Sequence, residues 1–228
     1  TNAHYPKQEH GPLRLVIDFS RCFTTLWRDK LGQISLAVTS LFWGAGATLQ
    51  FIVLKWAAAA LDMPLAQAAI LQGVVAFGVA FGAMAAAKRV PLKKSLTVMP
   101  LGFAMGIIVC TMAVVESVPV AYPILVLIGA LSGYFVVPMN ALLQHRGHVL
   151  MSAGHSIAVQ NFSENLSILM MLALYALLVK YDVEINAVIV LFGLFVAAIM
   201  WLVMRRHAKN QREYDSLHLI GEQKHYGT

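Results

Sequence analysis

The sequence predicts an all-α membrane protein, built as a bundle of six transmembrane helices. Of its 228 residues, 59% are hydrophobic and 12% are charged, and the mean hydropathy is +0.69. A soluble chain is about half apolar and a quarter charged. The apolar residues here also gather in long runs, and a run of about 20 residues is enough for a helix to cross a bilayer.

Six apolar segments are long enough to span a membrane, with short polar connections between them. They divide the chain into an expected cytoplasmic linker (1–32), a six-helix bundle (33–204) and a disordered cytoplasmic tail (205–228). The expected spans are residues 33–56, 65–87, 96–115, 120–143, 153–179 and 185–204.

The basic residues support this division. The formal net charge is +6, and 15 of the 17 Lys and Arg residues fall on one side of the predicted membrane. Only Lys55 and Lys180 fall on the other side. Because positive residues favour the cytoplasmic side, both termini are expected in the cytoplasm, and an odd number of spans would break the alternation. Basic residues placed in this way indicate membrane topology rather than a nucleic-acid partner.

Residues 12–30 differ from the spans. Leu13, Val16, Ile17 and Phe23 recur at near-helical spacing among arginines, which predicts an amphipathic helix on the cytoplasmic surface. The alternative is a short helix packed on the next part of the protein. The chain starts at Thr1 without Met or a signal peptide, so we expect a piece of a longer polypeptide.

Small residues are spaced for close helix packing in three consecutive spans. Glycines four residues apart lie on one face of a helix and let two backbones approach closely in lipid. This pattern indicates a compact bundle more than any one function. The pairs are Gly78 and Gly82, Gly102 and Gly106, and Gly129 and Gly133.

The fifth span carries four strongly polar residues, Gln160, Asn161, Glu164 and Asn165. At about 100° per residue they lie on one arc of the helix, which neighbouring serines extend. A charged residue at the bilayer centre costs about 3 kcal/mol on insertion scales, so Glu164 is expected to face a cavity or a partner. It could meet a cationic headgroup, a proton or a basic residue. Alternatively, the amides join helices by hydrogen bonds and Glu164 lies near the hydrated end.

Polar residues in two other spans are further candidates for a cavity. Asn140 and Gln144 are four residues apart near the end of the fourth span, where they could line a cavity or cap the helix. Gln50 lies near the middle of the first span, and two nearby glycines are expected to loosen that helix. Lys55 most simply extends its ammonium group to the outer interface.

Catalytic chemistry finds little support. Ser132 and His155 suggest an intramembrane serine protease, but the sequence around Ser132, GALSGY, lacks the Gly-x-Ser of that class. No phosphate-binding loop and no cluster of metal ligands appears, so we expect no catalytic residue, cofactor or metal.

Three segments carry a resemblance to a known family. They are SLFWGAGATLQF, FVVPMNALLQHRG and SAGHSIAVQNFSEN. Together they resemble the bacterial lysophospholipid transporters of the major facilitator superfamily, over residues 20–201. The resemblance implies that the chain is the C-terminal half of a twelve-helix fold. Relatives tend to carry a basic residue where Gln50 stands, so either Gln50 or Lys55 is expected to meet the lipid phosphate.

The resemblance also implies a function and partners. Such proteins move lysophosphatidylethanolamine and lysophosphatidylglycerol from the outer to the inner leaflet of the bacterial inner membrane, where an acyltransferase and acyl carrier protein synthetase re-acylates them. The N-terminal half of the transporter and the lipid bilayer are the other expected partners. A major facilitator porter for a drug or small solute is the first alternative, and an intramembrane hydrolase or a membrane scaffold are others. The expected substrate-binding residues are Glu164, Gln160, Asn161, Asn165, Gln50 and Asn140.

Overall fold

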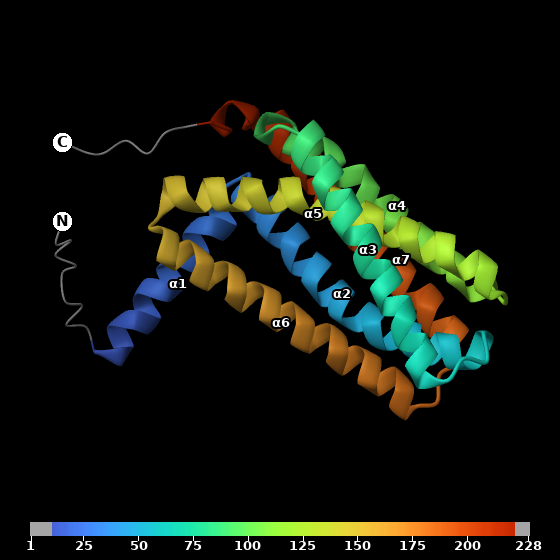
Figure 1. Ribbon diagram of the computed structural model, residues 1–228. Helices are drawn as coiled ribbons and strands as arrows, with labels where there is room; N and C mark the ends of the chain where they lie inside the picture. Colours follow the sequence, from blue (N-terminus) through green and yellow to red (C-terminus); the bar gives the residue numbers. More distant parts are fainter. Residues whose placement is uncertain (1–10, 222–228) are drawn as a thin grey trace, which may run out of the picture.

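The computed structural model describes residues 11–221, which form seven α-helices and three short 3-10 helices (Figure 1). The 3-10 helices are η1 (Leu92–Val98), η2 (Met112–Val114) and η3 (Leu217–Leu219). The α-helices are α1 (Pro12–Arg28), α2 (Gly32–Ala60), α3 (Leu65–Arg89), α4 (Met99–Thr111), α5 (Val118–Leu150), α6 (Ala153–Lys180) and α7 (Ile185–Glu213).

The predicted six spans are confirmed, because six helical segments in the described part of the chain are long and apolar enough to cross a bilayer. Residues 92–114 act as one span in which η1 and η2 flank α4. Two helices continue well past the expected borders. The fourth span reaches Leu150 and the sixth reaches Glu213. The sequence-based borders end too early in both helices because the last turns of these helices are polar.

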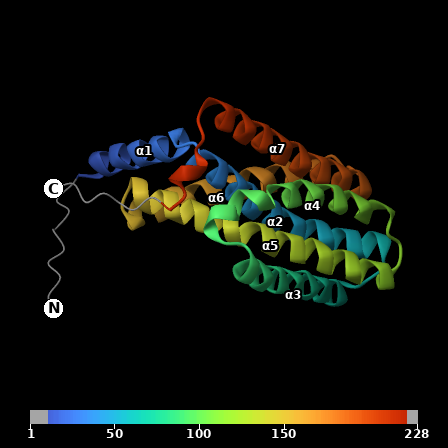
Figure 2. The same cartoon turned by 90° about the horizontal axis from the view of Figure 1, so that it is seen from above.

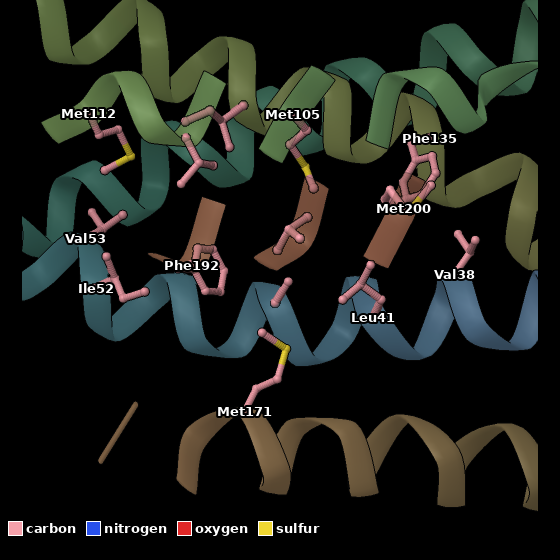
Figure 3. Close-up of a cluster of buried hydrophobic side chains, with 14 of the residues drawn as sticks. Val38, Leu41, Ile52, Val53, Met105, Met112, Phe135, Met171, Phe192 and Met200 are labelled. Carbon is pink, nitrogen blue, oxygen red and sulfur yellow. The ribbon is translucent and has the colours of Figure 1, made fainter. Parts of the chain in front are cut away.

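Helix α2 lies at the centre of the bundle, with α3 and α5 on one side and α6 and α7 on others (Figure 2). The most extensive contacts join α3 to α5, α4 to α7 and α2 to α6. Buried side chains from α2, α4, α5 and α7 meet in one hydrophobic core, including Phe135 and Phe192 (Figure 3). The Trp56 indole donates a hydrogen bond of 3.0 Å to the Met112 carbonyl oxygen, so this ring is both buried and paired.

The glycine pairs do bring helices together, as their spacing predicted. A Cβ atom on Gly82 would collide with the Ala130 carbonyl oxygen of α5, and one on Gly133 would collide with the Val79 carbonyl oxygen of α3. Gly106 of α4 is less tight but still close, because a Cβ there would lie 2.8 Å from the Gly193 carbonyl oxygen of α7. Only glycine permits these backbone approaches.

The two glycines in the first span, Gly44 and Gly46, do not loosen the helix as expected. Helix α2 is continuous through both of them. A Cβ atom on Gly44 would collide with the Ser167 hydroxyl, so this glycine is a packing residue for α6. Gly46 has nothing within 4 Å of a Cβ position and plays no comparable part.

The expected disorder of residues 205–228 is wrong for 205–221. Helix α7 continues to Glu213, and the following segment folds back so that Ser216 and Ile220 are buried. The Asn210 amide donates to the Lys30 carbonyl oxygen at 3.4 Å, which fixes this segment beside the start of α2. The remainder of the expected tail, 222–228, lies outside the described residues.

Helix α1 is amphipathic, as predicted, and its position on the cytoplasmic surface stays a prediction. Its Phe19 and Phe23 pack against Phe162 of α6, with ring centroids 5.2 and 6.0 Å away. Nearer the start of the same helix, Leu13 and Val16 remain 74% and 62% exposed. One part of the apolar face is therefore used for packing on the bundle, and another part is left uncovered by the described chain.

Candidate functional site

A hydrogen-bonded network of polar side chains joins α5 and α6. The Gln160 amide nitrogen donates to a Glu164 carboxylate oxygen at 2.8 Å and to the Asn140 side-chain oxygen at 3.3 Å. All three residues are half-buried. Gln160 and Glu164 are one turn apart on α6, so the helix itself sets their spacing. Three of the predicted site residues are thus in direct contact, and we call them the Gln160 network.

The remaining amides of the predicted arc stand apart from this network. Asn161 and Asn165 are exposed, and the Asn165 amide donates to the Asn161 carbonyl oxygen of its own helix at 2.7 Å. They face away from the bundle, where the described chain offers no opposing wall.

The serines that seemed to extend the polar arc have another role. Ser156 and Ser163 are buried, and the Ser163 hydroxyl donates to the Val159 carbonyl oxygen at 2.9 Å. Ser156 lies against Gly147 of α5, and Ser167 lies against Gly44 of α2. The arc therefore divides into a packing edge of small serines and a separate edge that carries the Gln160 network.

Gln50 is not brought together with the Gln160 network. Helices α2 and α6 run in the same direction (Figure 1), and Gly44 is level with Ser167. Gln50 lies six residues beyond this level and Glu164 three residues before it, a separation of about 14 Å along the axes at 1.5 Å per residue. The Gln50 side chain is exposed, and its carbonyl oxygen accepts a 2.6 Å hydrogen bond from Gln72. Lys55 is exposed one helical turn further on.

The structure contradicts two other interpretations from sequence, a helix cap at Asn140 and Gln144 and a catalytic pair of Ser132 and His155. Asn140 and Gln144 do not cap a helix, because α5 continues past them to Leu150. Ser132 and His155 form no catalytic pair. The Ser132 hydroxyl donates to the Ile128 carbonyl oxygen at 2.7 Å, about 27 Å along α5 from the end nearest His155. Across residues 11–221, no three His, Cys, Asp or Glu residues are grouped as metal ligands would be.

A buried ion pair at the end of α5 escaped the sequence reasoning. Arg146 donates through two nitrogens to the Asp29 carboxylate at 2.7 and 3.0 Å, and the two side chains are only 3% and 10% exposed. Asp29 also accepts from the Gly32 backbone at 2.7 Å, and Arg146 donates to the Leu219 carbonyl oxygen at 3.2 Å. The available signal was a lone arginine following a long apolar run, which we assigned to topology.

Together, the six spans and the half-buried polar network define a multi-pass α-helical membrane protein with a polar network in the first half of its fifth span. Comparison with known proteins shows which proteins the chain is similar to. The chain is 43% identical over 187 residues to the lysophospholipid transporter LplT of Pectobacterium carotovorum, and 41% identical over 209 residues to the proteins of that name from Escherichia fergusonii and Escherichia coli. These similarities bear out the predicted resemblance to the LplT family of lysophospholipid transporters.

The extent of these matches differs between the chain and its relatives. They cover 82% of this chain for the Pectobacterium protein and 90% for the Escherichia proteins. They cover 46% and 53% of the relatives, so the chain spans about half the length of the curated relatives it matches. No family model matches the chain, and no solved structure matches it.

Proposed function

We propose that this chain is the C-terminal six-helix half of a lysophospholipid transporter with the major facilitator fold. The complete protein would move lysophosphatidylethanolamine and lysophosphatidylglycerol from the outer to the inner leaflet of the bacterial inner membrane. The family match supports the substrate class, and the coverage of about half of each relative supports the assignment as one half. Transport is then the proposed function, and the naming of the relatives as transporters supports it.

The observation that carries the proposal is the Gln160 network within a membrane span. A half-buried carboxylate held by an amide is expensive in lipid and is expected to serve a function. Glu164 can attract an ammonium group such as that of ethanolamine, while Gln160 and Asn140 can donate to or accept from glycerol and phosphate oxygens. In this proposal Asn161 and Asn165 face the central cavity, whose opposing wall is the N-terminal half.

Gln50 and Lys55 lie away from the Gln160 network, and we assign them secondary roles in substrate binding. Because Gln50 lies about 14 Å beyond Glu164 along the helix axes, it would meet a headgroup at a different stage of its passage. Lys55, exposed another turn on, could attract an anionic phosphate at the outer entrance. The two halves would then rock against each other around the polar site, as in other transporters built from repeats.

Location and partners follow from the same proposal. The excess of basic residues on one side supports cytoplasmic termini. Lysophospholipid delivered to the inner leaflet would be re-acylated there by an acyltransferase and acyl carrier protein synthetase, which we propose as a partner of the complete transporter. The remaining partner is the bilayer itself.

The test follows transfer of labelled lysophosphatidylethanolamine between leaflets of inner-membrane vesicles that contain the complete polypeptide. We expect transfer well above that of vesicles without the protein, with inhibition by unlabelled lysophospholipids and none by small solutes. A protein that moves no lysophospholipid but carries a competing drug or solute would instead be a small-solute porter. Matched expression of each preparation, measured by immunoblot, controls for the amount of transporter.

A further inference from the structure

Two apolar cavities lie end to end between α6 and α7, along the part of α6 from Ser163 to Leu178. One has a volume of about 310 Å³ beside the first half of α2, and the other has about 420 Å³ beside its second half. Both are lined by Met171, Leu174 and Phe195. They are therefore adjacent, and together we call them the α6–α7 groove.

The groove exists because two helices that are neighbours in sequence pack on different partners. Helix α6 rests mainly on α2, whereas α7 rests mainly on α4. Met171 points from α6 towards α2 and forms part of the floor (Figure 3). Leu174 and Phe195 remain 52% and 41% exposed, so the groove is open along its length to the surrounding membrane.

The length of the groove exceeds the hydrocarbon depth of one leaflet. Its lining extends from Ser163 to Leu178 on α6, roughly 22 Å at 1.5 Å per residue. A leaflet contributes about 15 Å of the hydrocarbon core. A single extended acyl chain could thus lie in the groove for its whole length.

The volume and lining also fit hydrocarbon. A methylene group fills roughly the volume of a water molecule, about 30 Å³, so a chain of about sixteen carbons needs on the order of 480 Å³. The two cavities together provide more than that. No charged side chain lines them, and the Thr48 and Ser163 hydroxyls donate to carbonyl oxygens of their own helices.

One end of the groove is suited to a phosphate. Trp27 of α1 closes the groove near the start of α2. Just beyond the lining, Arg206 of α7 donates to the Gln33 side chain at 3.1 Å and is exposed. Arg205 lies beside it, over the Trp201 ring at 4.6 Å. An apolar groove that ends at arginines and indoles is complementary to an amphipathic anion with one tail.

We propose that the α6–α7 groove is a second lipid site, which holds the acyl chain of a lysophospholipid with its phosphate at Arg206. The proposal rests on the proposed function for its choice of a single-chain phospholipid. It places the phosphate near the side of the membrane where α2 begins, and the acyl chain along the part of α6 from Ser163 to Leu178. The groove would receive the lipid after its headgroup has crossed.

The experiment uses the complete polypeptide in nanodiscs and a lysophosphatidylglycerol with a photoactivatable diazirine at the end of its acyl chain. Cross-linked peptides are mapped by mass spectrometry. We expect labelling at Met171, Leu174 or Phe195, with at least fivefold loss when unlabelled lysophosphatidylglycerol competes. Diacyl phosphatidylglycerol at the same concentration should compete much less, because two tails do not fit beside each other.

Matched variants separate the groove from general lipid contact. Leu174→Trp fills the groove and should reduce its labelling at least fivefold, whereas Leu169→Trp, at a 66% exposed position on the same helix, should not. Arg206→Gln should weaken competition by lysophosphatidylglycerol several-fold. Labelling spread evenly over α3 and α6, or equal competition by the diacyl lipid, would overturn the proposal because either result indicates ordinary bilayer contact.

Transport measured in parallel keeps the two proposals distinguishable. If the wild-type protein moves no lysophospholipid but labels in the groove, the groove is a lipid site and the proposed function is wrong. If the protein transports normally and the groove stays unlabelled, the second lipid site is wrong and the proposed function is unaffected. A groove occupied by a helix of the N-terminal half would give this second result.

Discussion

At the scale of single residues, the Gln160 network separates a functional charge from a packing contact. Glu164→Gln keeps the size of the side chain and its contact with Gln160 but removes the charge. Since a charge inside a span costs about 3 kcal/mol to insert, the thermal unfolding temperature in detergent should stay level or rise. Transport of labelled lysophosphatidylethanolamine by the complete polypeptide should fall at least tenfold if the carboxylate meets the headgroup.

Leu169→Ala provides the control for this prediction. Leu169 lies on the same helix, is 66% exposed and takes no part in the Gln160 network, so its truncation should change transport less than threefold. Transport by Glu164→Gln at the wild-type rate would show that the network serves packing between α5 and α6. A fall in both transport and unfolding temperature would show the same.

The sequence could predict part of this site because part of it is local. Gln160 and Glu164 are one helical turn apart, and any helix would bring them together. Deciding whether Gln50 lies beside Gln160 and Glu164 required the axial register of α2 against α6. That register depends on how Gly44 and Ser167 pack. The serines of α6 were assigned to the polar arc for the same reason. The position of a residue around one helix does not show which neighbouring helix covers it.

At the scale of helices, the contact between α3 and α5 depends on glycine. Gly82→Ala would force a Cβ atom into the Ala130 carbonyl oxygen, and overpacking of this kind costs about 1–3 kcal/mol. Gly73→Ala in the same helix meets nothing within 4 Å, so it should be neutral or stabilise by up to about 1 kcal/mol. Thermal unfolding in detergent should therefore change in opposite directions, and equal losses would contradict the close approach.

Helix α1 offers a second test at this scale. Val16 is 62% exposed on the apolar face, whereas Thr25 lies exposed on the polar face. A nitroxide attached at Val16→Cys, with Cys22 and Cys110 replaced, should be shielded from a water-soluble relaxation agent and reached by oxygen in the bilayer. A label at Thr25→Cys should behave in the opposite way if α1 lies in the membrane interface. Equal exposure to the aqueous agent would place α1 outside the membrane.

Across the whole molecule, the segments just before α2 and at the end of α7 meet on one side of the bundle. Lys30 pairs with Glu213 at 3.5 Å, and the Asn210 amide bonds to the Lys30 carbonyl oxygen. Six spans lead to this arrangement, since an even number returns the chain to its starting side. Hydropathy and charge were sufficient to predict that much. They could not predict the fold of residues 205–221, because polar segments gain order from particular partners rather than from hydrophobicity.

The Asp29–Arg146 pair lies where these segments contact each other, and removing it tests the whole fold. It joins the segment before α2, the end of α5 and, through the Leu219 carbonyl oxygen, the segment after α7. Removing one partner of a buried ion pair costs about 3–5 kcal/mol because the other charge is left unpaired. Arg146→Met and Asp29→Asn should each lower the unfolding temperature markedly, and the double variant should lose less than their sum. Strictly additive losses would show that the two residues stabilise the bundle independently.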